Sequence, residues 1–186
     1  MNNLYIGLVH YPVYNKNNNI VCTSITNLDI HDIARTSRTY NVKKFFIINP
    51  QPSQRKIFER LKRFWHTDVA KEYNVCRFNA FDTIKYVDSI EEAKKIIQNK
   101  TDFKPLVFTT SADTKPKSIS YKKGSKLIEN HGAALILFGT AYGLAREVIK
   151  NSNYNIEKIE GVNGYNHLSV RSAIAITLDR LIADYK

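Results

Sequence analysis

Short apolar runs alternate with amphipathic stretches along this chain, and the alternation predicts its elements. Strands are expected at residues 4–10 (LYIGLVH), 43–50, 84–87, 105–112, 133–139 (AALILFG) and 154–159. Helices are expected at residues 27–40, 53–66, 89–98, near Leu127, at 143–150, and from about Ser169 to the end. This order is typical of an α/β protein with a mostly parallel sheet and helices on both faces.

Three of the expected helices carry more specific signals. In the helix at 27–40 the apolar stripe is expected on Leu28, Ile33, Ala34 and Ser37. In the helix at 53–66 the apolar residues recur at helical spacing, which favours core packing: Ile57, Phe58, Leu61, Phe64 and Trp65. Its other face is basic, with Arg55, Lys56, Arg60, Lys62 and Arg63. Ser89 and Glu92 have the spacing of a capping box.

Length and composition favour one soluble domain over residues 1–186. The hydrophobic fraction of 43% is ordinary for a globular protein with a core, and no linker, repeat or low-complexity segment divides the chain. No apolar run approaches the roughly 18 residues that span a membrane, and MNNLYIGLVHYP lacks the features of a signal peptide. Cys22 and Cys76 do not suggest a disulfide framework. We expect a cytoplasmic protein with reduced thiols and no membrane contact.

The charge balance indicates a class of partner. The formal net charge is +11 and the isoelectric point is about 9.6. Lys and Arg neutralise phosphates, so a nucleic acid is one natural partner. Many basic proteins bind no nucleic acid, so charge alone leaves both readings open.

Small residues gather in the last third of the chain. Four of the seven glycines, Gly139, Gly143, Gly161 and Gly164, follow the last two expected strands, near Thr140, Asn166 and Ser169. Ligands of open α/β sheets bind at the carboxyl ends of strands, so a site is expected there, although each glycine alone also fits a tight turn. No P-loop, dinucleotide fingerprint, nucleophile elbow or metal-ligand spacing is present, so we expect no bound metal.

Three segments resemble the ordered motifs of the SPOUT RNA methyltransferases. They are NLDIHDIARTSRTYNVKKFFIINP, LILFGTAYGLA and GYNHLSVRSAIAITLDRL, and the resemblance covers nearly the whole chain. It is strongest to a small bacterial branch of S-adenosylmethionine-dependent RNA methyltransferases, whose members are sometimes joined to a tRNA guanine-N1 methyltransferase. HYPVYNK, TNLDIHDIAR and NHLSVRSA are similar to that branch in particular.

The resemblance implies a C-terminal trefoil knot, a homodimer and S-adenosylmethionine held in the knot loops. Adenine would lie between apolar side chains such as Phe138 and Leu168. By motif position, the implied cofactor-binding residues are Thr109, Thr110, Ser111, Phe138, Gly139, Thr140, Gly143, Ile159, Glu160, Gly161, Tyr165, Asn166, His167, Leu168 and Ser169.

The first motif implies the chemistry. Asn27 and Arg35 match the Asn and Arg that lie near the target nucleotide in SPOUT ribose methyltransferases, and Ser169 or Glu160 would polarise the acceptor. A guanidinium stays protonated, so holding a phosphate suits Arg35 better than acting as a base. Ala141 and Tyr142 stand where many relatives have a G-x-E-x-x-G pattern, so that carboxylate is missing.

The expected function is methyl transfer from S-adenosylmethionine to RNA, either tRNA or rRNA, with the ribose 2′-hydroxyl favoured over a base nitrogen. The expected RNA-binding residues lie on basic segments that are otherwise ordinary solvated faces: Arg38, Arg55, Lys56, Arg63, Lys122 and Lys123. Two alternatives remain at this stage. One is a non-catalytic RNA-binding or assembly module with the same fold, and the other binds S-adenosylmethionine or a nucleotide without RNA.

Overall fold

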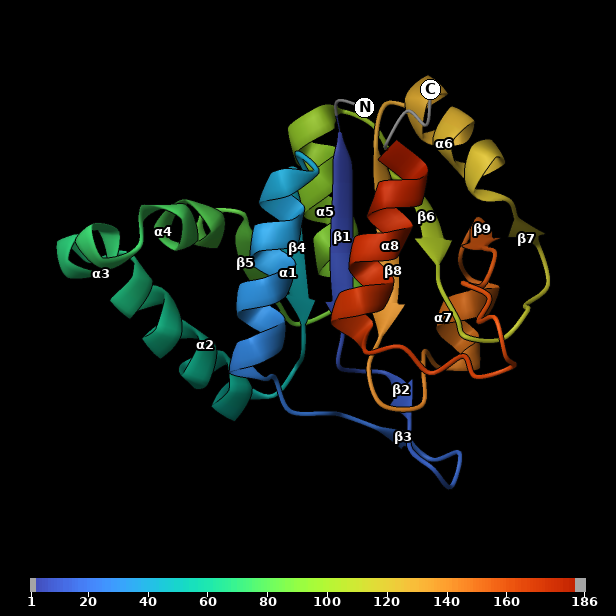
Figure 1. Cartoon of the computed structure of the whole chain (residues 1–186), viewed down its shortest axis with the longest axis horizontal. Coiled ribbons are helices and arrows are strands. Elements are labelled where there is room, and N and C mark those ends of the chain that lie inside the picture. Colours follow the sequence, from blue (N-terminus) through green and yellow to red (C-terminus); the bar gives the residue numbers. More distant parts are fainter. Residues whose placement is uncertain (1–2, 183–186) are drawn as a thin grey trace.

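A seven-stranded parallel sheet forms the centre of the molecule, as a computed structural model shows for residues 3–182 (Figure 1). Its strands lie in the order β5-β4-β1-β8-β6-β9-β7. Their bounds are β1 Leu4–Val9, β4 Lys44–Ile48, β5 Ile84–Val87, β6 Leu106–Thr109, β7 Ser118–Ile119, β8 Ala134–Gly139 and β9 Tyr154–Ile156. All neighbouring strands pair in parallel, so their carboxyl ends meet at one edge of the sheet.

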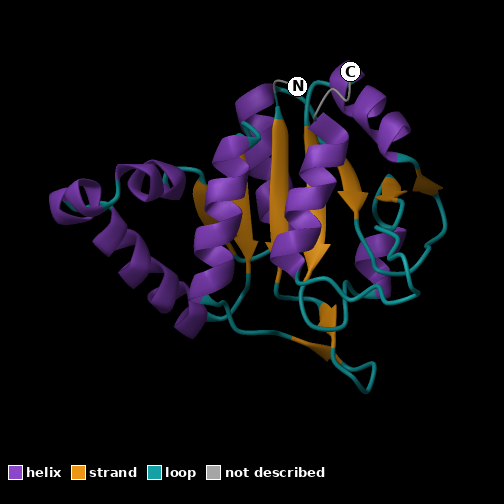
Figure 2. Ribbon diagram, viewed as in Figure 1, coloured by secondary structure: helices purple, strands orange, loops and turns teal. Residues whose placement is uncertain are grey.

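Helices cover both faces of this sheet, which confirms the α/β prediction (Figure 2). Six lie on the face packed by Ile33 and Ile174: α1 Asn27–Thr39, α2 Pro52–Trp65, α3 Asp68–Tyr73, α4 Val75–Phe81, α6 Tyr121–Asn130 and α8 Val170–Ile182. Two lie on the other face: α5 Ile90–Thr101 and α7 Arg146–Lys150. The central strands β1 and β8 are buried along almost their whole length, as expected of continuous apolar runs.

The predicted apolar stripe of α1 is wrong at one position. Leu28 is 64% exposed, whereas Ile30 is buried together with Ile33, Ala34 and Ser37. The reason is geometric, because Leu28 precedes Ile30 by two residues and therefore points to the other side of the helix. In α2 the prediction holds for Phe58 and Trp65, which are buried, and for Leu61, which packs against the core half-buried. It is wrong for Ile57 and Phe64, which are about half exposed.

Several short elements lie where the sequence predicted loops. Residues 13–14 and 20–21 form the antiparallel pair β2 (Val13–Tyr14) and β3 (Ile20–Val21), and β7, α3 and α4 were also not predicted. The capping box of α5 is only partly formed: Ser89 accepts from the Glu92 backbone N–H, but the Glu92 carboxylate accepts from the Asp88 N–H. The closing helix is described up to Ile182, so its expected extension over residues 183–186 lies outside the described part. No helix among residues 3–182 is long and apolar enough to cross a membrane.

Candidate active site

The three predicted cofactor segments follow three neighbouring strands. Residues 109–111 end β6, residues 138–143 end β8, and residues 159–169 follow β9. Because β8, β6 and β9 are adjacent and parallel, these segments all emerge at the carboxyl edge of the sheet (Figure 1). The Asn166 side-chain amide donates to the Ala112 carbonyl at 2.7 Å, which joins the segment after β9 to the segment after β6. The structure therefore brings together loops that the sequence indicated separately.

Two glycines allow these loops to fold tightly. A Cβ on Gly161 would lie 1.9 Å from the Tyr165 carbonyl oxygen, and one on Gly139 would lie 2.7 Å from the Leu144 nitrogen. Both obstacles are backbone atoms, which no side-chain rotation moves away. Only glycine is compatible with this path of the chain. The clustering of glycines noted in the sequence therefore has a steric cause.

The side chains of β6 and β8 are less available than predicted. The Phe138 side chain is 1% exposed and packs in the core, so it cannot flank adenine as expected, although its backbone remains at the loop. Thr109 is also fully buried and donates to the Asn155 side chain. Thr110 donates to the Leu137 carbonyl, and Ser111 accepts from the Asp113 backbone N–H. Phe138 is buried because helices cover both faces of β8, so that Phe138 packs in the core on one face of the sheet and Leu137 packs on the other.

The segment after β9 presents most of the exposed candidates. Tyr165 and Leu168 are 69% and 46% exposed, and the Tyr165 ring meets the His167 ring edge-on at 5.3 Å. Glu160 forms an ion pair with Lys158, whereas Ile159 packs against the core. Ser169 begins α8 as its cap, since its hydroxyl oxygen accepts from the Ser172 backbone N–H. Exposed apolar and polar groups thus alternate over a short stretch.

The β2–β3 hairpin supports the loop after β8. The Tyr14 backbone N–H donates to the Gly143 carbonyl at 2.9 Å, and the Tyr142 N–H donates to the Tyr14 carbonyl at 3.0 Å. Val13 also forms a β-bridge with Leu144. The segment HYPVYNK, which resembled the family, therefore includes residues that hold the predicted cofactor loop in place.

A chain of hydroxyl groups fixes Thr140 to the end of β1. The Thr140 hydroxyl donates to the Val9 carbonyl at 3.1 Å and lies 2.7 Å from the Thr23 hydroxyl. Thr23 must then donate to Thr140, so the Nδ1 atom of His10, 2.8 Å from Thr23, carries a proton and donates to it. The Nε2 atom of His10 is left unprotonated, buried and without a hydrogen-bond partner in the described structure.

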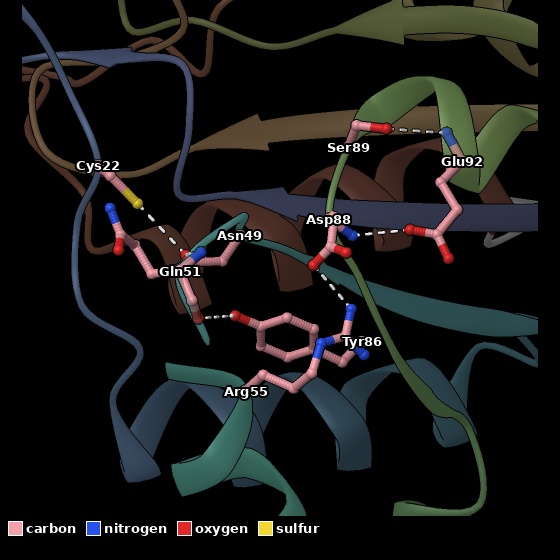
Figure 3. Close-up of polar contacts among 8 residues, drawn as sticks. All are labelled: Cys22, Asn49, Gln51, Arg55, Tyr86, Asp88, Ser89 and Glu92. Carbon is pink, nitrogen blue, oxygen red and sulfur yellow. Dashed lines mark hydrogen bonds and ion pairs between the residues drawn. The ribbon is translucent and has the colours of Figure 1, made fainter. Parts of the chain in front are cut away.

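Burial lowers the pKa of His10 to about 4, and this effect outweighs the opposing effect of the Asp29 carboxylate. The imidazole is therefore neutral at physiological pH, and the hydrogen-bond chain places its single proton on Nδ1. Next to it, the Asn49 side-chain amide donates to the Thr23 carbonyl. The Asn49 side-chain carbonyl oxygen accepts from the Cys22 thiol (Figure 3). Burial also raises the pKa of the Cys22 thiol. These groups form an uncharged support for the loop.

Asn27 and Ser169 lie on neighbouring helix starts. Asn27 is the exposed first residue of α1, and Thr26 caps that helix. Arg171, in the first turn of α8, pairs with Asp29 at 3.3 Å and with Asp32 at 3.4 Å. This ion pair holds the first turns of α1 and α8 together. Arg171 was not a predicted site residue, although it lies inside the quoted NHLSVRSA motif.

Arg35 is more distant from these loops. It follows Asn27 by eight residues, which corresponds to roughly 12 Å along the helix axis. It is exposed, while Ile33 and Ala34 beside it are buried. Within one chain, the structure therefore brings Asn27 close to the carboxyl edge but not Arg35.

The predicted RNA-binding residues lie in three separate places. Arg55 is partly exposed and already has partners in this chain, since it pairs with Asp88 at 2.7 Å and lies 4.6 Å over the Tyr86 ring (Figure 3). Burial raises the pKa of the Tyr86 hydroxyl to about 12, and Arg55 acts against that rise. The other candidates are exposed: Lys56 and Arg63 on α2, Arg38 near the end of α1, and Lys122 and Lys123 at the start of α6. Because α2 and α6 lie near opposite edges of the sheet, these residues do not form one patch.

Two surface hollows in the described part of the chain include predicted site residues. One, of about 290 Å³, is bounded by residues around β7 and contains Glu160 alone of the predicted cofactor residues. The other, of about 470 Å³, lies between the start of α1 and α2 and contains Asn27. Within residues 3–182, no group of three or more His, Cys, Asp or Glu side chains is placed to hold a metal ion.

The fold is an α/β sheet with candidate ligand loops at its carboxyl edge, and comparison with known proteins gives its class. A family model described as S-adenosylmethionine-dependent RNA methyltransferase matches residues 3–183. The chain belongs to this family, whose cofactor is S-adenosylmethionine. The catalytic class and the cofactor expected from the sequence are thus confirmed.

Individual relatives add detail. The chain is 34% identical over 182 residues to an uncharacterized protein of Aquifex aeolicus, covering 97% of this chain and 89% of that one. It is 40% identical over 186 residues to a protein of Oleidesulfovibrio alaskensis named tRNA (guanine-N(1)-)-methyltransferase, covering 98% of this chain but 42% of the relative. The crystal structure of an A. aeolicus TrmH/SpoU tRNA modifying enzyme matches with a TM-score of 0.59 and 12% identity, covering 97% and 74% of the two chains.

Proposed function

We propose that the loops after β6, β8 and β9 bind S-adenosylmethionine and that the bound methyl group is transferred to tRNA or rRNA. The observation that carries this proposal is the meeting of three hydroxyl-containing loops, two of which also contain glycines, at neighbouring parallel strand ends. Gly161 and Gly139 bring backbone groups close together, and Leu168 and Tyr165 offer exposed apolar surface. Such a combination fits a ligand with an apolar adenine ring and polar ends.

The cofactor supplies an activated methyl group on a positively charged sulfur. In the transfer, the bond from carbon to sulfur breaks as the bond from carbon to the acceptor forms, and the acceptor loses a proton. The protein then mainly has to align the acceptor with the methyl carbon. Asn27 and Ser169, on the neighbouring starts of α1 and α8, are the residues we assign to positioning the acceptor.

The ribose 2′-hydroxyl is the acceptor that we favour. Its support is the match of Asn27 and Arg35 to the ribose methyltransferase motif. The name of the O. alaskensis relative points instead to N1 of guanine, but this chain spans 42% of that protein. The guanine nitrogen is therefore the alternative to be tested.

We also propose one domain with a C-terminal knot, which assembles as a homodimer. Four apolar side chains near the loops are at least 46% exposed, which supports a covering partner: Tyr142, Val162, Tyr165 and Leu168. In a dimer, Arg35 of one protomer is free to approach the loops of the other. Sedimentation equilibrium is expected to give twice the monomer mass, and a monomer at every concentration would contradict this part.

Calorimetric titration with S-adenosylmethionine and S-adenosylhomocysteine tests the site. We expect binding near one ligand per chain. Gly161→Ala is expected to abolish binding, because its Cβ would meet the Tyr165 carbonyl. Gly124→Ala is the control, since its Cβ would meet only movable side-chain ends at 3.1 Å. Melting temperatures of both variants show whether they fold, and normal binding by a folded Gly161→Ala protein would exclude this site.

Transfer of a labelled methyl group to bulk tRNA and rRNA tests the reaction. Arg35→Ala is expected to lose transfer, whereas Lys95→Ala on α5 is expected to keep it. Alkaline hydrolysis then identifies the acceptor, because a 2′-O-methyl ribose resists cleavage and N1-methylguanosine does not. RNA binding without transfer to any RNA would favour a non-catalytic binding module, and wild-type transfer by Arg35→Ala would exclude the assigned role of Arg35.

A further inference from the structure

Helix α2 has one apolar face that packs into the core and a second that lines a surface groove, and Leu61, which packs against the core, lies between them. Phe58 and Trp65 are buried. Ile57, Leu61 and Phe64 recur at helical spacing on a second face, and that face lines the hollow of about 470 Å³. The remaining residues of its lining are Ile25, Asn27 and Arg60. This volume is within the range of about 300–1,000 Å³ of small-molecule sites.

Phe64 lines this groove with a ring whose movement is restricted by packing. Phe64 is 51% exposed, and its ring contacts the buried Trp65 ring edge-on, with 5.3 Å between the ring centroids. Trp65 in turn stacks on Phe81 at 5.5 Å and contacts the His31 ring at 5.1 Å. The exposed ring is therefore backed by a packed aromatic cluster, which limits its movement.

The charge beside the groove is strongly positive. Helix α2 carries five basic residues and one acidic residue, Glu59. Lys56, Arg60 and Arg63 share one side of the helix, next to the groove face. None of these three forms an ion pair in the described part of the chain. An aromatic ring beside unpaired arginines is the arrangement that binds single-stranded nucleic acid by stacking and by phosphate contacts.

We propose that this groove binds an unpaired nucleotide of the RNA substrate. The base lies against Phe64 and the apolar side chains of Ile57 and Leu61, while Arg60 with its basic neighbours holds the adjoining phosphates. The inference rests on the proposed function, because that function makes RNA the substrate. Asn27, which lines the groove and begins α1, connects it to the proposed site of transfer.

The charge argues against the other occupants of an apolar groove. A second copy of this chain has a net charge of +11 and would bring its own basic surface against Lys56, Arg60 and Arg63. A neutral apolar partner would leave these side chains uncompensated. An RNA segment supplies both the aromatic faces and the negative charges that this surface lacks.

The test compares Phe64→Ala with Phe103→Ala. Both phenylalanines are 51% exposed, but Phe103 lies at the amino edge of the sheet, before β6. The probes are a synthetic RNA stem–loop and a fully paired duplex of the same stem. We expect Phe64→Ala to weaken stem–loop binding about 10-fold, as loss of one stacked base does, and to leave duplex binding unchanged. Phe103→Ala is expected to match wild type with both probes.

A second pair of variants tests the phosphate contact. Arg60→Gln is expected to make the slope of log affinity against log salt concentration less steep by about 0.7, because one phosphate contact is lost. Phe64→Ala is expected to leave this slope unchanged. Lys95→Gln, an exposed charge on α5, is the control for loss of one positive charge. Because Trp65 is the only tryptophan and touches Phe64, stem–loop binding is also expected to change its fluorescence in wild type.

Several results would overturn the inference. One is that the wild-type protein does not bind the stem–loop, and another is that the two phenylalanine variants bind it with equal affinity. The inference is also wrong if Phe64→Ala loses the same affinity for the stem–loop and for the duplex, or if it converts a dimer to a monomer. Binding of S-adenosylmethionine is measured in the same variants and is expected to be normal. Its absence in wild type would refute the proposed cofactor site, while loss of loop binding alone concerns only the groove.

Discussion

A single buried histidine connects pH to the support of the proposed cofactor loop after β8. His10 is 1% exposed, and its Nδ1 atom donates into the chain that ends at Thr140. Protonation of Nε2 would place a charge in a buried position with no partner. The folded protein therefore keeps His10 neutral down to about pH 4, whereas an unfolded histidine takes up a proton near its ordinary pKa of about 6.5.

It follows that stability falls with acid between about pH 6.5 and pH 4, because the unfolded state binds the extra proton there. His10→Asn keeps a side-chain donor near Nδ1 and removes the titration. From pH 7 to pH 5, urea unfolding is expected to show wild type losing about 2 kcal/mol more than this variant. Burial also lowers the pKa of His31. Because both proteins contain His31, its contribution to the loss of stability cancels in the comparison. Parallel losses in the two proteins would contradict a buried neutral His10.

At the scale of elements, an ion pair links two helices that are far apart in sequence. Arg171 on α8 contacts Asp29 and Asp32 on α1, and Asp29 is 15% exposed on its side chain. Exposed ion pairs contribute little to stability, but a mostly buried carboxylate that loses its partner is costly. The pair fixes the relative position of the two helix starts that carry Asn27 and Ser169.

Arg171→Met is expected to lower the free energy of unfolding by about 1 kcal/mol and to lower methyl transfer by more than this loss explains. Arg171→Lys retains the charge and is expected to recover part of both. A double-mutant cycle with Asp29→Asn measures the coupling between the two side chains. Additive effects in that cycle would show that the 3.3 Å contact does not link the helices.

The elements also show what the apolar pattern can predict. Helical spacing located α2, but it did not reveal that Phe58 and Trp65 face the core while Ile57 and Phe64 face a groove. Spacing defines faces of a helix, whereas burial depends on what packs against each face. The two-residue strands β2 and β3 were not predicted, because their pairing depends on contacts with the loop after β8.

At the scale of the whole molecule, alternation predicted the parallel sheet but not the order of its strands. The glycines indicated the loops after β8 and β9, and the order β8-β6-β9 explains why Thr110 and Ser111 join them. The same topology separates the predicted basic residues, because α2 and α6 lie near opposite edges. Distances between such segments arise from the folded chain and have no signature in sequence spacing.

This separation raises the question of whether one RNA contacts both edges. Lys56 and Arg63 lie on α2, while Lys122 and Lys123 lie on α6. If one RNA contacts these four side chains and Arg60, it makes about five phosphate contacts. The plot of log affinity against log salt concentration then has a slope of about −4. Raising salt from about 50 to about 200 mM is then expected to weaken tRNA binding on the order of 10²-fold.

Paired substitutions determine which edge contributes. Lys56→Gln with Arg63→Gln and, separately, Lys122→Gln with Lys123→Gln are each expected to reduce the slope by about 1.5, since each removes two phosphate contacts. Lys95→Gln with Lys100→Gln on α5 removes the same charge from another surface and is expected to leave the slope near wild type. A reduced slope in one pair alone would place the RNA at that edge only. A slope near zero in wild type would contradict an RNA partner held by charge, whatever the activity of the loops.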